Sequence, residues 1–183
     1  VGGIAGYNYG GVIDASYATA SVDGAYFIGG LAGVNNSGVI AACFAAGSVS
    51  GTTSVGGLTG YNWYPSGLII NCYSTDSVSG TDKIGGLVGT NDQSRIITCY
   101  STASVSGTDP AGGLVGYDEF GLITSCIWNI ETCGTSYGVG NIIPDPAGVR
   151  GKMTDQMKML STFADAGWDF VNETTNGTEE IWT

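Results

Sequence analysis

A short glycine-rich phrase recurs five times along the chain, and its spacing constrains the fold more than any other feature. The copies read apolar-Gly-Gly-Leu-x-Gly, with Ile for Leu in the first. They begin at residues 1, 28, 55, 84 and 111, so successive copies lie 27, 27, 29 and 27 residues apart. A fixed period of this size is typical of a chain wound into stacked coils. The sequence therefore predicts a solenoid of five coils.

Aligning the copies also aligns the residues that follow them into columns. The columns are Ile13, Ile40, Ile69, Ile96 and Ile123; Cys43, Cys72, Cys99 and Cys126; and Asn8, Asn35, Asn62 and Asn91. The Ile and Cys columns are three residues apart, so both can face inward only if a corner or bulge separates them. We expect the Ile column to be buried and the Asn column to bind corner backbone groups through its side chains.

The segments between the glycines favour strands, because they are short, rich in Val, Ile, Thr and Tyr, and without helical periodicity. A coil of this length has room for three short strands, and each coil adds about 4.8 Å to the stack. The glycines permit positive φ or close backbone approach at the corners. We predict an all-β parallel solenoid, a right-handed β-helix, over residues 1–137. The two extra residues of the third coil fall at Trp63–Ser66, which marks a surface corner.

The composition changes after Tyr137, which predicts a separate capping segment over residues 138–183. A helix is expected near residues 154–166, with Thr154 as its N-cap, Gly167 as its stop, and Met157, Leu160 and Ala164 on one face. Large apolar residues follow at Trp168, Phe170, Ile181 and Trp182. We expect the helix and these anchors to cover the open end of the solenoid core.

The charge balance limits the partners and the chemistry. The net charge is −11, with five basic residues and no His. Nucleic-acid binding is not expected without a basic face, and no apolar run is long enough to insert into a membrane. Acid–base catalysis lacks its usual groups, so the sequence predicts no catalytic residue.

The repeated residues carry a resemblance to a known family. Gly-Gly-Leu-Val-Gly-x-Asn, followed by Ile-x-x-Cys-Tyr-Ser-Thr and Val-Ser-Gly, resembles the GLUG-motif repeat, and the resemblance covers residues 1–137. That family is found mainly in large bacterial surface and secreted proteins, beside protease, adhesin or carbohydrate-active modules. The repeat has no agreed activity, so the resemblance implies an architecture and a secreted or cell-surface location rather than a reaction.

The cysteine column has more than one interpretation. Its members are about 4.8 Å apart, which lies within the Cα range of a disulfide, but parallel side chains hold the Cβ atoms too far apart. A linear column also cannot surround a zinc ion. We predict buried, reduced thiols, and a disulfide between Cys126 and Cys133 stays open.

Two acidic pairs and one aromatic pair are candidate binding groups. Asp82 shares a column with Asp109, and Asp92 shares another with Glu119. A Ca²⁺ ion at either pair would relieve the repulsion, and so would splaying of the carboxylates into water. Calcium is therefore the one cofactor that these residues suggest. Trp63 and Tyr64 protrude at the inserted corner, where they could contact a sugar ring or a protein.

Together these features favour an extracellular structural or adhesive repeat module that serves as a stalk, spacer or filament subunit. The alternative is a carbohydrate-active or carbohydrate-binding β-helix module of a larger secreted protein. The expected partners are other coils of the same parent chain or another copy stacked head-to-tail, and glycans or host or cell-surface proteins. Because Val1 opens directly into the first coil, we expect the parent protein to continue with further coils.

Overall fold

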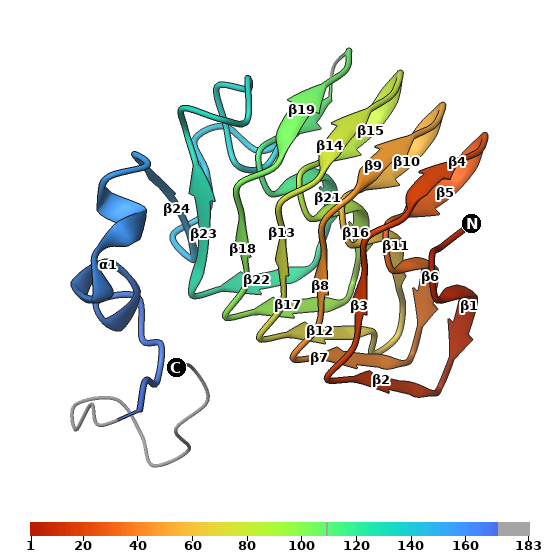
Figure 1. The fold of residues 1–183 in the computed structure, drawn as a ribbon, viewed down its shortest axis with the longest axis horizontal. Helices are drawn as coiled ribbons and strands as arrows, with labels where there is room; N and C mark the ends of the chain where they lie inside the picture. Colours follow the sequence, from red (N-terminus) through yellow and green to blue (C-terminus); the bar gives the residue numbers. More distant parts are fainter. Residues whose placement is uncertain (109, 172–183) are drawn as a thin grey trace.

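The chain forms a stack of coils, which the computed structural model describes for residues 1–108 and 110–171. The coils follow one another from the N-terminal end (red) to the C-terminal end (blue) in Figure 1. Each strand pairs in parallel with the equivalent strand of the coils before and after it. The predicted all-β parallel solenoid is confirmed. Each of the first four coils has five short strands rather than the three expected.

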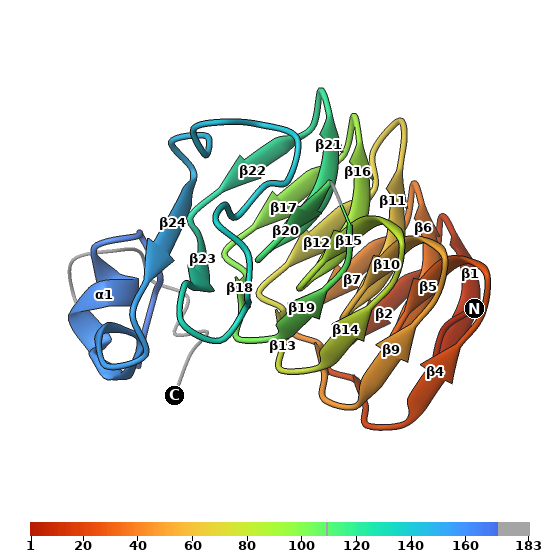
Figure 2. The ribbon, with the colours of Figure 1, turned by 90° about the horizontal axis from the view of Figure 1, so that it is seen from above.

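Five parallel sheets make up the walls of the solenoid, and they are seen from above in Figure 2. The Asn sheet consists of β1 (Ala5–Tyr9), β6 (Ala32–Asn36), β11 (Thr59–Trp63), β16 (Val88–Asp92) and β21 (Val115–Glu119). The Ile sheet consists of β2 (Val12–Asp14), β7 (Val39–Ala41), β12 (Leu68–Ile70), β17 (Arg95–Ile97) and β22 (Leu122–Thr124).

The other three sheets complete each turn of the chain. The aromatic sheet consists of β3 (Tyr17–Ala18), β8 (Phe44–Ala45), β13 (Tyr73–Ser74), β18 (Tyr100–Ser101), β23 (Cys126–Asn129) and β24 (Val149–Lys152). The Val sheet consists of β4 (Ser21–Asp23), β9 (Ser48–Ser50), β14 (Ser77–Ser79) and β19 (Ser104–Ser106). The Gly sheet consists of β5 (Tyr26–Gly29), β10 (Thr53–Gly56), β15 (Asp82–Gly85) and β20 (Ala111–Gly112).

A left-handed residue forms the corner between the Ile and Cys columns in every coil. These residues are Ala15, Ala42, Asn71, Thr98 and Ser125, with φ between 44° and 55°. Because this residue turns the backbone, the Ile and Cys side chains both point into the core despite their three-residue spacing. The central members of the Ile column are fully buried, whereas Ile13 in the first coil is only partly buried.

The recurring glycines allow close approach of neighbouring backbone segments rather than positive φ. At the corners, residues other than glycine adopt positive φ. A Cβ on Gly60 of the Asn sheet would lie 2.5 Å from the backbone nitrogen of Ile28 in the Gly sheet. A Cβ on Gly89 would lie 2.6 Å from the nitrogen of Val55 in the same way. These two sheets therefore lie backbone against backbone, and the last glycine of the second to fifth phrases has no room for a side chain.

A partial sixth coil, which the sequence analysis missed, closes the C-terminal end of the core. Val139 forms a bridge with Val115, and β24 pairs with β23. The Asp145 carboxylate accepts hydrogen bonds from the backbone N–H groups of residues 138 and 139 and from the Trp128 indole. Of the repeated phrase, only Gly138–Asn141 remains in this coil, which is why the period did not reveal it.

The C-terminal segment differs from its prediction in both conformation and position. The expected helix over 154–166 is a 3-10 turn, η1 (Gln156–Lys158), and a short helix, α1 (Leu160–Ala164), separated by extended Met159. Thr154 does not cap a helix, because its hydroxyl bonds to Asn129 instead. Leu160, expected on the apolar face, is 56% exposed.

This segment packs on the outer face of the aromatic sheet instead of covering the end of the core. Trp168 is buried against Ile127 of β23, and its indole N–H donates to the Ser125 carbonyl at 2.7 Å. The aromatic sheet offers apolar side chains on its outside, so the anchors bury their surface there while the partial coil closes the core. Gly167, at φ 88°, follows α1 as expected of its stop. The anchors Ile181 and Trp182 lie outside the described residues.

Candidate binding site

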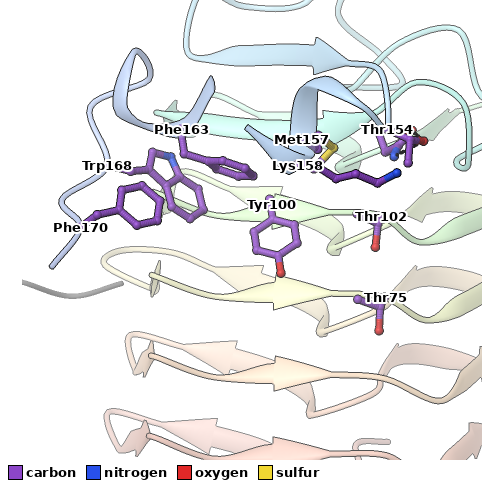
Figure 3. A pocket seen from close by; sticks show the side chains of 10 residues that line it. Thr75, Tyr100, Thr102, Thr154, Met157, Lys158, Phe163, Trp168 and Phe170 are labelled. Atoms are coloured by element: carbon purple, nitrogen blue, oxygen red, sulfur yellow. Dashed lines mark hydrogen bonds between the residues drawn. The ribbon is translucent and has the colours of Figure 1, made fainter. Parts of the chain in front are cut away.

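A pocket lies between the C-terminal segment and the outer face of the aromatic sheet. Figure 3 shows Phe163, Trp168 and Phe170 gathered at one end of it, while Thr75 and Thr102 lie toward the other. Its volume is about 380 Å³, which falls at the lower end of the range of small-molecule sites.

Several polar groups of this pocket are already bonded to other side chains. Thr154 is bonded to Asn129, and the Lys158 ammonium is bonded to the Asp155 carboxylate at 3.1 Å. Burial, and then the neighbouring Tyr73, raises the pKa of Tyr100 to about 12, so its phenol stays neutral. The pocket therefore lies at the interface between the C-terminal segment and the aromatic sheet.

The aromatic column that leads to this pocket is a continuous stack. Ring centroids lie 5.1 Å apart between Tyr17 and Phe44, 4.9 Å between Phe44 and Tyr73, and 4.8 Å between Tyr73 and Tyr100. Phe163 and Trp168 close its C-terminal end, each 5.9 Å from the Tyr100 ring. The stack thus orients the aromatic faces along the solenoid axis and joins the coils on the outside.

A second, smaller hollow lies on the outer face of the Asn sheet, and we call it the aromatic slot. It is lined by Tyr7, Phe27, Val34, Tyr61 and Trp63 and has a volume of about 260 Å³. The Phe27 and Tyr61 rings meet edge to face at 5.1 Å, and the Tyr61 and Trp63 rings do so at 5.9 Å. Of the two aromatic residues singled out in the sequence, Trp63 lines the slot, whereas Tyr64 is exposed at the corner beyond it.

The polar groups beside the slot hold its tyrosines in place. The Tyr61 hydroxyl donates to Asp92 at 3.1 Å, and the Asn36 amide donates to the Tyr7 hydroxyl at 2.6 Å. Burial, and then the Asp92 carboxylate, raises the pKa of Tyr61 to about 12. Tyr61 therefore remains a neutral donor across the physiological range.

Among the described residues, Asp82, Asp92 and Glu119 belong to no larger cluster of metal-binding groups. Asp92 and Glu119 are register partners on neighbouring strands, and Asp92 is already bonded to Tyr61 and Gln93. Asp82 lies at the start of β15, while Asp109 falls outside the described residues. Among residues 1–108 and 110–171, no three His, Cys, Asp or Glu side chains are grouped so that they could hold a metal ion.

The cysteine column lies inside the core as free thiols, and the structure gives the column a polar role that sequence reasoning missed. Each Sγ donates to the carbonyl two residues earlier, at 3.0 Å in Cys43 and 3.1 Å in Cys72 and Cys99. The Sγ atoms of these three also accept the backbone N–H of the coil before, at 3.4 Å. Cys126 and Cys133 are both free and buried. Burial, and then the neighbouring thiols, raises the pKa of Cys99, which keeps it protonated.

The asparagine column is a buried ladder of side-chain amides. The Nδ2 atoms of Asn8, Asn35 and Asn62 each donate to the next Asn at 2.8–2.9 Å, and Asn91 donates to Asp118 at 2.7 Å. Each amide also donates to a carbonyl of its own corner. In the third coil this bond, to Gly67, lengthens to 3.4 Å because the two inserted residues lie between the partners.

Comparison with known proteins assigns the repeat but no activity. The GLUG motif matches residues 1–23, 51–79 and 83–106. No curated protein and no solved structure matches the chain. Among the described residues, no helix has the length and apolarity needed to cross a membrane. The matched segments are coils of one continuous solenoid, and the chain is a GLUG-repeat protein.

Proposed function

We propose that this chain is an extracellular structural and adhesive module, a rigid spacer whose outer faces bind other molecules. The observation that supports this proposal most is the continuity of its side-chain ladders. The amide ladder runs through all five coils from Asn8 to Asp118, and the aromatic stack joins four of them from Tyr17 to Tyr100. Coils that are bonded through side chains as well as strands resist bending and separation.

The outer faces also suit contact with other molecules. The Val sheet exposes columns of serine hydroxyls, such as Ser48 bonded to Ser21, and the Asn sheet exposes the rings of Tyr7 and Trp63. Exposed aromatic groups beside polar side chains are typical of binding surfaces.

A binding screen tests the adhesive part of this proposal. The purified chain would be immobilised and exposed to a glycan array and to a panel of cell-surface and extracellular-matrix proteins. We expect saturable binding to at least one class, lost on thermal unfolding. If folded protein binds no member of either panel, the adhesive function is wrong and only the spacer function remains.

We further propose that another coil, from the same parent chain or from a second copy, stacks on the first coil. Ile4 is 48% exposed and Val12 is 69% exposed there, beside strand edges of β1 and β2 that pair on one side only. Such edges favour the addition of further strands. Light scattering over a concentration series should show head-to-tail association of this chain that Ile4→Lys and Val12→Lys abolish. A monomer at every concentration would contradict stacking by a second copy.

A further inference from the structure

We propose that the aromatic slot binds one ring of a neutral sugar, with Trp63, Phe27 and Tyr61 packing against its C–H faces and the Tyr7, Asn36 and Asp92 side chains meeting its hydroxyls. The inference rests on the proposed adhesive function and names its ligand class. It combines the slot's shape, its aromatic walls and its polar rim.

The slot arises from an alternation of large and small side chains along one column. Tyr7, Val34 and Tyr61 are successive register partners in the Asn sheet. The two tyrosines are therefore separated by two strand spacings, about 9.6 Å, with a valine between them. Val34 is only 7% exposed and forms the floor. A valine between two tyrosines therefore leaves a space about one ring wide.

The walls of this space are aromatic and reachable from solvent. Phe27 and Trp63 are each 41% exposed, and both rings stand edge to face with Tyr61 between them. Interplanar angles of 76° and 84° set neighbouring walls nearly at right angles. Aromatic faces carry partial negative charge and attract the polarised C–H groups of a pyranose ring.

The rim supplies hydrogen-bonding groups of both kinds. The Tyr7 hydroxyl accepts from Asn36 and keeps its own proton to donate, while Asp92 accepts from Tyr61 and Gln93. A ligand with an apolar face and a ring of hydroxyls matches this arrangement. The net charge of −11 disfavours acidic sugars. The volume of about 260 Å³, just below the range for drug-sized ligands, suits a single ring.

The next equivalent position along the same column is filled. Thr90, between Tyr61 and Tyr117, is 1% exposed and its hydroxyl is bonded to Ser54 at 2.8 Å. The Lys83 ammonium lies 4.7 Å from the centre of the Tyr117 ring and covers it. Phe27 stands where these coils have Ser54 and Lys83, so the open slot belongs to the first three coils.

The test is a titration of the full chain with glucose, galactose, mannose, N-acetylglucosamine and glucuronic acid, followed by Trp fluorescence and by saturation-transfer NMR. We expect at least one neutral sugar to bind and glucuronic acid to bind at least about tenfold more weakly. Val34→Tyr, which repeats the residue found at this column in coils 1, 3 and 5, should fill the slot and abolish binding. Trp63→Ala and Phe27→Ala should each weaken binding at least about tenfold.

Matched controls separate the slot from aromatic exposure in general. Tyr64→Ala and Phe120→Ala remove rings that are 51% and 88% exposed outside the slot, and both should leave binding unchanged. The melting temperature of each variant shows whether it is folded, and Trp63→Ala tests the inference even if Val34→Tyr does not fold.

The following outcomes would overturn the sugar site without contradicting the proposed adhesive function. Sugar binding that survives Val34→Tyr and Trp63→Ala would overturn the slot. So would a wild-type chain that binds none of the neutral sugars, or one whose slot binds a proline-rich peptide or a fatty acid instead. If the same chain still binds protein partners in the screen, the adhesive function stands and only the sugar site is wrong.

Discussion

At the scale of single residues, the asparagine ladder shows how the repeat accommodates a different residue at one position. Asp118 takes the place of asparagine in the fifth coil and accepts from Asn91 and from the Gly121 backbone N–H. Burial raises the pKa of its carboxyl and outweighs these two hydrogen bonds, which act in the opposite direction. A raised carboxyl pKa means that the native state holds its proton to higher pH than the unfolded chain does.

Asp118→Asn should therefore stabilise the protein at neutral pH. The unfavourable contribution of Asp118 is absent below the unfolded carboxyl pKa of about 3.9 and develops as the pH rises through the folded pKa. The new amide would continue the ladder by donating to the Gly121 carbonyl, as Asn35 does to Gly38. Melting curves should show a higher melting temperature for the variant at pH 7 and convergence of the two proteins toward pH 3. Equal profiles at all pH values would contradict the assignment.

Asp76 is a second buried carboxyl, and it compensates for a missing serine in the neighbouring coil. In the third and fourth coils, Ser74 and Ser101 accept the backbone N–H two residues later. The second coil has Ala45 at that position, and Asp76 accepts the N–H of Gly47 in its place.

Asp76→Ala should therefore destabilise the protein by roughly 1–3 kcal/mol, the cost of a buried unpaired donor, partly offset by removal of a buried charge. Ala45→Ser in the same chain should recover most of this loss, because the new hydroxyl reaches Gly47. A double-mutant cycle in urea measures the coupling. Additive effects of the two changes would show that the serine and the carboxylate do not serve the same N–H.

At the scale of elements, the corner between the Ile and aromatic sheets stores backbone strain. Its left-handed residue is asparagine in the third coil but Thr98, a β-branched residue at φ 52°, in the fourth. Branching at Cβ makes this conformation costly, whereas asparagine tolerates it.

Thr98→Asn should raise the free energy of unfolding by roughly 1 kcal/mol. The reverse change at the equivalent corner, Asn71→Thr, should lower it by a similar amount, and chemical denaturation measures both. If Thr98→Asn is neutral while Asn71→Thr destabilises, the strain is relieved in the fourth coil by packing.

The thiol ladder follows the same corner. Because the Sγ atoms donate to and accept from the backbone, alkylation or oxidation would break bonds between coils as well as packing. Thiol titration should find five free cysteines in denatured protein and almost none accessible in native protein. Cys72→Ser should destabilise less than Cys72→Val, because serine keeps a donor and an acceptor. Non-reducing mass analysis showing a disulfide would contradict this account.

At the scale of the whole molecule, the solenoid is modular along its axis. Among the described residues, each strand pairs only with the equivalent strands of the coil before and the coil after it, so stability is approximately the sum of coil and interface contributions. Deleting residues 84–110 joins Lys83 to Ala111 in register and should give a folded rod about 4.8 Å shorter.

Deleting only half of this coil, residues 84–97, provides the control and should abolish cooperative unfolding because the columns lose register. Circular dichroism and small-angle X-ray scattering measure the fold and the length. If the whole-coil deletion also fails to fold, the coils depend on contacts beyond their neighbours.

The sequence by itself determined the features that repeat. Identical residues at a period of about 27 must stack on one another, so the coils, the Ile, Cys and Asn columns and the surface corner at Trp63 could all be predicted. Features that occur once carried no such signal. The partial sixth coil retains only Gly138–Asn141 of the phrase. The prediction of the C-terminal helix rested on a weak local pattern, which packing overrode, so only the short α1 forms.

Only the tertiary structure decided which faces of the solenoid are occupied. With the same local sequence, the C-terminal anchors could cover either the open end of the core or the outer face of the aromatic sheet. The partial sixth coil, in which Asp145 is bonded to Trp128, already closes the end of the core, so the anchors pack on the sheet. The aromatic slot likewise depends on residues from three coils. Tyr7, Val34 and Tyr61 are visible as a column, but Phe27 joins them only because glycines let two sheets approach at backbone distance. Periodicity specifies which residues stack, whereas the path of the chain around each coil specifies which columns meet.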